Sequence, residues 1–88
     1  MLFVFDDYAP RVFWMKNTFV DLDMVFLDQG LKVMKVFHRV PRSRPDQPEA
    51  EVASASSPAA FVLELPAGTA RAHGVRTGVR LKVSYSQK

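Results

Sequence analysis

The sequence predicts an all-β fold with one short helix, in the form of a mostly antiparallel β-sandwich or flattened barrel. Apolar side chains alternate with a period of two along several stretches, which is typical of strands. Proline and glycine residues end these stretches, and strands do not alternate with long helical patterns. With 88 residues, of which 48% are hydrophobic, the chain suffices for a single domain, 1–88, with a modest core.

The N-terminal half predicts three strands. The first covers residues 1–5, where apolar and aromatic side chains open the chain. Residues 22–27 and 33–40 follow as an alternating pair. Asp28-Gln29-Gly30 lies between them as a short turn in which the glycine can adopt a positive φ, so the pair forms a β-hairpin. The hairpin ends at Val40, because Pro41 has no N–H to donate.

Residues 41–60 predict a long loop rich in proline, serine and alanine. Loops of this length are either functional or disordered. This one lacks the aromatic or paired polar side chains of a binding loop, and we expect part of it to be mobile.

The C-terminal part predicts two strands around a short helix. Residues 60–65 are apolar on both faces except for Glu64, as in a central strand. Thr69 is the predicted N-cap of a helix over residues 70–73, which Gly74 ends. Residues 79–85 alternate again and predict a half-exposed last strand.

The first candidate site is the stretch around Trp14. In one interpretation the Trp14 ring is a stacking platform for a sugar or a base, while Lys16, Asn17 and Thr18 supply hydrogen-bonding groups. In the other, Trp14 anchors the core and Asn17-Thr18 makes a turn. The residues alone leave both interpretations open.

Two carboxylates, Asp23 and Glu64, interrupt apolar strands and complete the set of candidate binding residues. An ionised carboxylate in such a strand is costly unless it is paired, hydrogen-bonded or turned to solvent. We expect Asp23 to accept hydrogen bonds from the turn at residues 16–18, and Glu64 to have a structural or edge-facing role. A further alternative is that the two carboxylates converge for acid–base hydrolysis.

The motifs Phe13-Trp14-Met15-Lys16-Asn17-Thr18 and Leu22-Asp23-Met24-Val25-Phe26, followed by Phe61-Val62-Leu63-Glu64-Leu65 with three later glycines, form an ordered series. This series resembles the signatures of the domain of unknown function 192 family of small bacterial and archaeal proteins. The resemblance implies a compact β-sandwich and no established activity.

Relatives of this family usually carry a segment before the first strand, and this chain begins at that strand. We therefore expect an uncovered apolar edge and pairing of two copies into a dimer. Val4, Phe5, Phe13 and residues 79–85 are the expected contributors. Relatives are also often exported, so a periplasmic or extracellular location stays open, although as written the chain has no leader and reads as cytoplasmic.

Composition excludes several chemistries. Without cysteine there are no disulfides, thiolate metal sites or Cys nucleophiles, and His38 and His73 lack partners at metal-ligand spacing, so we expect neither a metal nor a cofactor. No apolar run is long enough to span a membrane. Residues 65–88 are basic, but only Tyr85 interleaves with the cations, so nucleic acid is not an expected partner.

Three function classes remain. The leading one is a small binding or accessory module for a small polar ligand or sugar near residues 14–18. The second is a structural, self-associating protein without a small-molecule ligand. The third is a hydrolase that uses Asp23 and Glu64.

Overall fold

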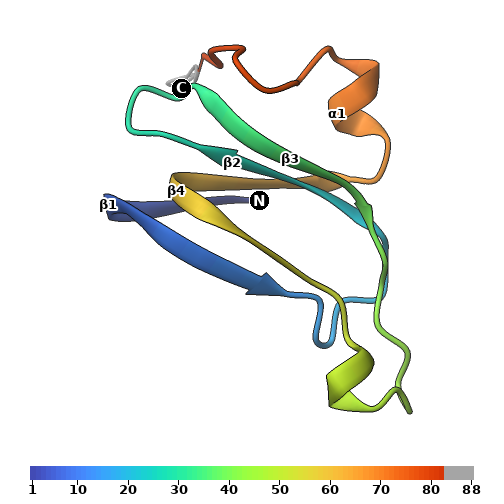
Figure 1. Cartoon of the computed structure of the whole chain (residues 1–88). Helices are drawn as coiled ribbons and strands as arrows, with labels where there is room; N and C mark the ends of the chain where they lie inside the picture. Colours follow the sequence, from blue (N-terminus) through green and yellow to red (C-terminus); the bar gives the residue numbers. More distant parts are fainter. Residues whose placement is uncertain (83–88) are drawn as a thin grey trace, which may run out of the picture.

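The computed structural model describes residues 1–82 and confirms the predicted β-rich class. Within this range four strands form one sheet in the order β1-β4-β2-β3, and every pairing is antiparallel. The elements are β1 (Leu2–Trp14), β2 (Leu22–Leu27), β3 (Val33–Val40), the 3-10 helix η1 (Glu49–Glu51), β4 (Ser54–Pro66) and α1 (Thr69–Ala72). The sheet has two edges, β1 and β3, so in the described residues it is not a closed barrel (Figure 1).

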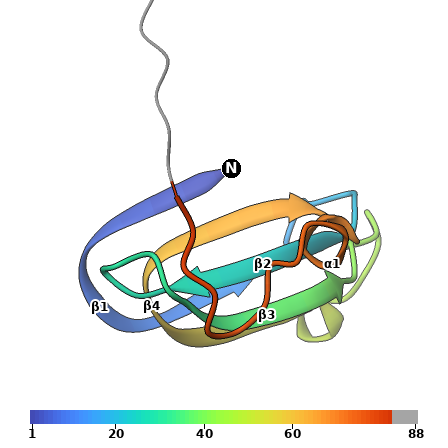
Figure 2. The same ribbon diagram turned by 90° about the horizontal axis from the view of Figure 1, so that it is seen from above.

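A strong bend in β1 and β4 gives the sheet its layered shape. The start of β1 pairs with residues 61–63 of β4, and its end, from Ala9 to Trp14, pairs with residues 54–59. The register shifts between Val4 and Ala9, where a β-bulge lets the strand turn. Figure 2 shows both strands curving round, so that the sheet folds back over itself. The two arms of one sheet therefore take the place of the two sheets of a sandwich.

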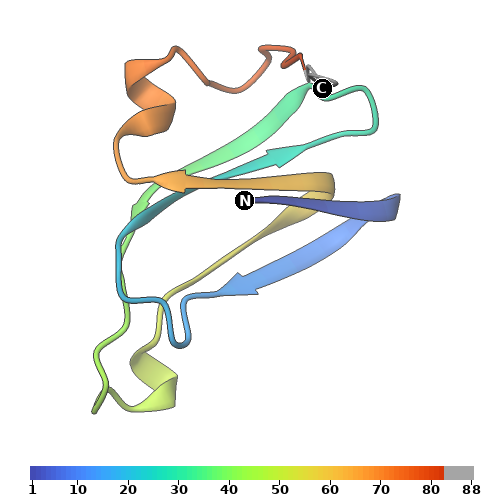
Figure 3. The same ribbon diagram turned by 180° about the vertical axis from the view of Figure 1, so that it is seen from behind.

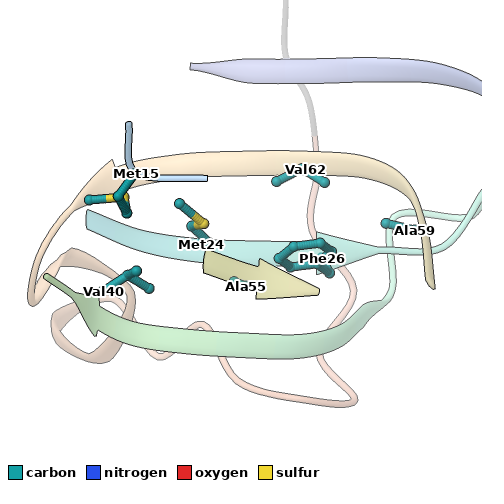
Figure 4. Close-up of a cluster of buried hydrophobic side chains, with 7 residues drawn as sticks. All are labelled: Met15, Met24, Phe26, Val40, Ala55, Ala59 and Val62. Carbon is teal, nitrogen blue, oxygen red and sulfur yellow. The ribbon is translucent and has the colours of Figure 1, made fainter. Parts of the chain in front are cut away.

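The main core fills the inside of this curl (Figure 4). Its buried members are Met15, Met24, Phe26, Val40, Ala55, Ala59 and Val62. Phe26 lies in edge contact with two other rings, with ring centroids 5.9 Å from Phe13 and 5.4 Å from Phe37. Aromatic pairs in this geometry stabilise a core beyond the area that they bury.

A second cluster covers the opposite face of β2 and β4. Val25, Leu27 and Val33 are buried there against Ala70 of α1. Strand β2 thus has apolar cover on both faces, which explains why five of its six residues are buried.

The loop predicted over residues 41–60 is shorter in the structure, because β4 already begins at Ser54. The first half of β4 has only small side chains, so it lacks the large apolar residues from which a strand is usually predicted. Ala55 and Ala59 are buried in the main core, between the two arms of the curled sheet. Small residues fit between these arms, so the alanines belong to the strand rather than to a loop.

Two predicted turn details also differ. Gly68, not Thr69, is the N-cap of α1, with a φ of 91°. In the hairpin turn the positive φ of 65° belongs to Leu31 rather than to Gly30. The carboxylate of Asp28 fixes that turn by accepting hydrogen bonds from the backbone N–H groups of Gly30 and Lys32, both at 2.9 Å. Side-chain acceptors of this kind stabilise turns without help from glycine.

Other C-terminal expectations are met in part. Gly74 follows α1 with a φ of 68°, as predicted for the residue that ends a helix. The predicted last strand, 79–85, is only a single bridge between Arg80 and Lys32 in the described part of the chain, and residues 83–85 lie outside it. No helix within residues 1–82 combines the length and apolar character needed to cross a membrane.

Candidate ligand-binding site at Trp14

Trp14 is exposed at the end of β1. It pairs with Ser54 of β4, and strand alternation turns the preceding Phe13 inward and Trp14 outward. The Phe13 ring packs edge-on against Phe3 at 4.9 Å, whereas 58% of Trp14 is accessible to solvent. Phe13, rather than Trp14, is therefore the aromatic residue that anchors the core at this point.

A tight turn directly after Trp14 presents the next polar side chains. Met15 is buried, and its carbonyl oxygen accepts a hydrogen bond from the Thr18 N–H at 3.0 Å. Asn17 takes the left-handed conformation with a φ of 59°, which asparagine tolerates better than most residues. The turn leaves Lys16 and Asn17 exposed beside the indole ring.

The segment from residue 41 to residue 53 packs against this turn. The backbone N–H and the hydroxyl of Ser43 both donate to the carbonyl oxygen of Thr18, at 2.8 and 3.2 Å. The amide side chain of Gln47 accepts from the Arg44 N–H and donates to the Glu51 carbonyl. The loop thus contains paired polar groups. The sequence did not reveal them, because each bond joins a side chain to a backbone group at least three positions away.

Two adjoining hollows lie between the turn and this segment. The first, of about 180 Å³, has Trp14, Lys16, Glu49 and Val52 as its lining residues. The second, of about 130 Å³, shares the last three and adds Asn17, Phe19, Ser43, Arg44, Pro45 and Gln47. We call the two together the Trp14 hollow. Glu49 of η1 lines both parts of it, and Figure 3 shows η1 at the bottom of the molecule and α1 at the top.

The Trp14 hollow combines a flat aromatic surface with donors and acceptors. Lys16 Nζ lies 3.5 Å from Glu49 Oε1, and both side chains are mostly exposed. Exposed ion pairs contribute little to stability. Lys16 and Glu49 can therefore break their ion pair and bind a ligand instead at a low cost in free energy. The indole ring and Val52 supply apolar contact in the same space. Such a mixture suits a small ligand with one apolar face and several hydroxyl groups.

Of the six predicted site residues, the structure brings three together in this hollow: Trp14, Lys16 and Asn17. Thr18 supports it from behind through its carbonyl oxygen. The residues that sequence reasoning missed come from the loop and the turn, namely Phe19, Arg44, Gln47 and Glu49. The unusual length of the predicted loop was the one available signal.

Asp23 has a different environment from the predicted one. It is fully buried and lies on the face of β2 that α1 covers, not beside the turn at residues 16–18. Its Oδ1 accepts a hydrogen bond from the Arg39 N–H at 2.9 Å, and its Oδ2 accepts from the N–H groups of Gly68 at 3.0 Å and Ala70 at 2.9 Å. The predicted structural role holds, but the predicted donors were wrong.

The position of Asp23 opposite a bulge explains these partners. Leu22 pairs with Val40 while Met24 pairs with Phe37, so two residues of β3 lie opposite Asp23 alone. Arg39 adopts a left-handed φ of 52° in this bulge, and its N–H turns to the carboxylate. Burial raises the pKa of Asp23, but the hydrogen bonds from Arg39, Ala70 and Gly68 outweigh it and hold the pKa below the ordinary value of 3.8.

Glu64 lies on the other face of the sheet. It pairs with Met24, and paired residues share a face, whereas Asp23 is the neighbour of Met24 and points the opposite way. Burial raises the pKa of Glu64, partly offset by the amino group of Met1. The two carboxylates therefore have no common cleft for acid–base chemistry. Within the described residues no cluster of three His, Asp or Glu side chains could hold a metal ion.

Comparison with known proteins agrees with the predicted resemblance. Residues 1–83 match the model of the DUF192 family, described as "Uncharacterized ACR". The chain belongs to the DUF192 family. No curated protein matches this chain significantly.

A solved structure is also similar to this DUF192 chain. It is a crystal structure of a "putative transcription regulator" from Sinorhizobium meliloti 1021, which is 36% identical, with a TM-score of 0.79. The match covers 93% of the chain and 60% of the neighbour, so this DUF192 chain spans about three fifths of the length of that protein.

Proposed function

We propose that this protein is a binding module for a small polar ligand of the sugar type, held in the Trp14 hollow. The observation that carries the proposal is the exposed indole ring next to a hollow with cationic, anionic and amide side chains. The C–H face of a sugar ring can stack on an indole ring, while its hydroxyl groups bond to the surrounding polar groups.

The fixed geometry of the hollow supports this function. The hydrogen bonds from Ser43 to Thr18 and within the Gln47 network join the loop to the turn and to itself. A pre-formed site loses less conformational entropy on binding than a mobile one. Neither Asp23 nor Glu64 reaches the hollow, so the proposal is binding without hydrolysis.

The description of the S. meliloti neighbour raises DNA binding as another function. The longest helix of the described residues, α1, has four residues, which is too short to serve as a recognition helix in a major groove. A ligand-binding module within a longer regulator is compatible with that description. The ligand site, and not DNA contact, is therefore the function that we propose for this chain.

Tryptophan fluorescence tests the proposal directly, because Trp14 is the single tryptophan of the chain. We expect a saturable fluorescence change with at least one member of a panel of monosaccharides, oligosaccharides and nucleosides. Trp14→Ala should weaken binding about tenfold or more in calorimetry, since stacking on an aromatic ring contributes roughly 1–3 kcal/mol. Trp14→Phe should retain part of the affinity.

Val12→Ala is the matched control for this experiment. Val12 is on the same outward face of β1 and is 56% exposed, but it does not line the Trp14 hollow. Its replacement should change affinity less than twofold. Absence of saturable binding across the panel at millimolar concentration, or unchanged affinity of Trp14→Ala, contradicts the proposal.

Self-association is the second candidate function, and one observation favours it. Strand β1 is an edge of the sheet, and its outward face carries the exposed residues Leu2, Val4, Tyr8, Val12 and Trp14. An apolar edge with free backbone groups can pair with its copy across a twofold axis. Of the predicted contributors, Val4 is exposed on this face, whereas Phe5 and Phe13 pack against the core.

We propose Val4→Glu to test the dimer, since Val4 is 66% exposed while Phe3 packs on the core. If β1 pairs with its copy, sedimentation at micromolar concentration should show a dimer for the native chain and a monomer for Val4→Glu. Lys35→Glu on β3 is the control and should leave the association state unchanged. A monomeric native chain rules out this interface.

A further inference from the structure

A third hollow lies at the α1 end of the molecule. It has a volume of about 320 Å³ and is lined by His38, Arg71, Gly74, Val75 and Arg76. His38 comes from β3 and Arg71 from α1, while the other three follow α1 in the chain. Figure 1 shows α1 at the top and η1 at the bottom of the molecule, and this hollow shares no lining residue with the Trp14 hollow.

The charged side chains that line this hollow are arginines, and the buried carboxylate of Asp23 behind its walls is bound by backbone N–H groups. Two of its lining side chains are arginines and a third is a histidine, and in the described residues none is acidic. Residues 66–82 and strand β3 contain no Asp or Glu at all. The ion pairs found within residues 1–82 involve Arg11, Lys16 and Arg42, not the arginines of this hollow. The guanidinium groups of Arg71 and Arg76 repel each other where they line one space, and a bound anion relieves that repulsion.

We propose that this basic hollow binds the phosphate group of a small phosphorylated ligand. Arginine presents N–H groups in a fixed fork that matches phosphate oxygens, and two arginines can contact one phosphate together. The imidazole N–H of His38 offers a further donor from the opposite wall. The volume leaves room for a small body beyond the phosphate, against the apolar side chain of Val75.

Asp23 holds both walls of the hollow in place. Its Oδ1 binds the N–H of Arg39, the residue next to His38. Its Oδ2 binds the N–H groups of Gly68 and Ala70, directly before Arg71. One buried carboxylate thus fixes the β3 wall relative to the α1 wall, and a fixed spacing of donors favours binding of a group with fixed geometry.

The shape of the hollow favours a small ligand over a nucleic acid. Proteins that bind single strands use aromatic platforms along an extended basic groove. In the described part of the chain, no Phe, Tyr or Trp lines this compact hollow. The compact shape and the lack of aromatic lining residues therefore favour a phosphorylated small molecule over a nucleic acid.

The test is an NMR titration of the ¹⁵N-labelled chain with inorganic pyrophosphate at constant ionic strength, with chloride as the reference salt. We expect saturable shifts at the end of β3 and over residues 71–76. Arg71→Gln combined with Arg76→Gln should weaken binding about tenfold or more, because the variant removes both guanidinium groups that offer charged N–H donors to the phosphate. Both arginines are exposed, so the double variant should fold normally.

Lys35→Gln combined with Lys82→Gln is the matched control. It removes the same charge from exposed positions outside the hollow and should change affinity less than twofold. Equal losses in the two double variants would mean diffuse attraction and would overturn the proposal, as would shifts that do not saturate. A single-stranded oligonucleotide that binds more tightly than pyrophosphate and depends on Lys35 and Lys82 would overturn the choice of a small ligand.

Discussion

Asp23→Ala is expected to lower the free energy of unfolding by about 3–5 kcal/mol. The substitution leaves three backbone N–H groups without their acceptor: that of Ala70, which is buried, and those of Arg39 in the β3 bulge and Gly68 before α1, which are partly buried. It also removes the hydrogen bonds that join the start of α1 to β2, which leaves the packing of Ala70 against the sheet as the remaining attachment. A domain of this size has little stability to lose, so the variant should be partly unfolded at ordinary temperature.

Urea unfolding followed by circular dichroism measures this effect. Asp6→Ala is the control, because Asp6 is exposed on β1, and its change should stay within about 0.5 kcal/mol. Asp23→Asn should fall between alanine and the native chain, since an amide keeps one acceptor oxygen and turns an N–H toward the other donors. A native-like urea midpoint for Asp23→Ala would show that the three hydrogen bonds contribute nothing.

The same carboxylate predicts a pH dependence. The folded state holds the pKa of Asp23 below the unfolded value of about 3.8, so the stability that it contributes is present above that value. This stability is lost as the pH falls through the folded pKa, because the protonated carboxyl group is a poorer acceptor. The difference in unfolding free energy between the native chain and Asp23→Asn should therefore shrink below about pH 4.

Phe26→Ala is expected to cost about 3–5 kcal/mol, the usual range for an aromatic residue removed from a core. Phe26 is fully buried in the centre of the curled sheet and contacts Phe13 and Phe37 edge-on. Alanine would leave a cavity that the two arms of the sheet cannot close without distorting the strand pairing.

Thermal and urea unfolding of Phe26→Ala and Phe19→Ala separate this effect from the general loss of a ring. Phe19 is 55% exposed, so its replacement should change stability by no more than about 0.5 kcal/mol. Equal stability of the two variants would mean that the core does not depend on Phe26.

The parts of the fold that could be predicted from the sequence are those with local signals. The hairpin of β2 and β3 follows from alternation over residues 22–40 and from the Asp28 turn, and α1 follows from the glycines that flank it. The start of β4 could not be found in this way. Its inward residues are alanines, and their suitability depends on an arm of the sheet that is distant in sequence.

The residues of the candidate site also fall into those with a local sequence signal and those brought in by long-range contacts. Trp14, Lys16 and Asn17 are contiguous or nearly so, and their types suggested a binding motif at once. Arg44, Gln47 and Glu49 join them through long-range contacts, among them the bond from Ser43 to Thr18, between positions 25 apart, and the bond from Met15 to Ala53. The donors to Asp23 are more distant still, at separations of 16, 45 and 47 positions. Neither composition nor periodicity carries information about such contacts.

The pairing of β1 with β4 has a consequence for the route by which the chain folds. The first residues of β1 meet the end of β4, with Met1 bonded to Glu64 across 63 positions of sequence. Closing so long a loop costs entropy before any strand contact compensates for it, whereas the β2 and β3 hairpin closes through a short turn. The hairpin can therefore form early and fast, whereas the curled arrangement of β1 and β4 forms only after β4 is available to pair. During synthesis on the ribosome, β1 has no partner until residues 54–63 of β4 have followed it, and in that interval its apolar residues are open to aggregation.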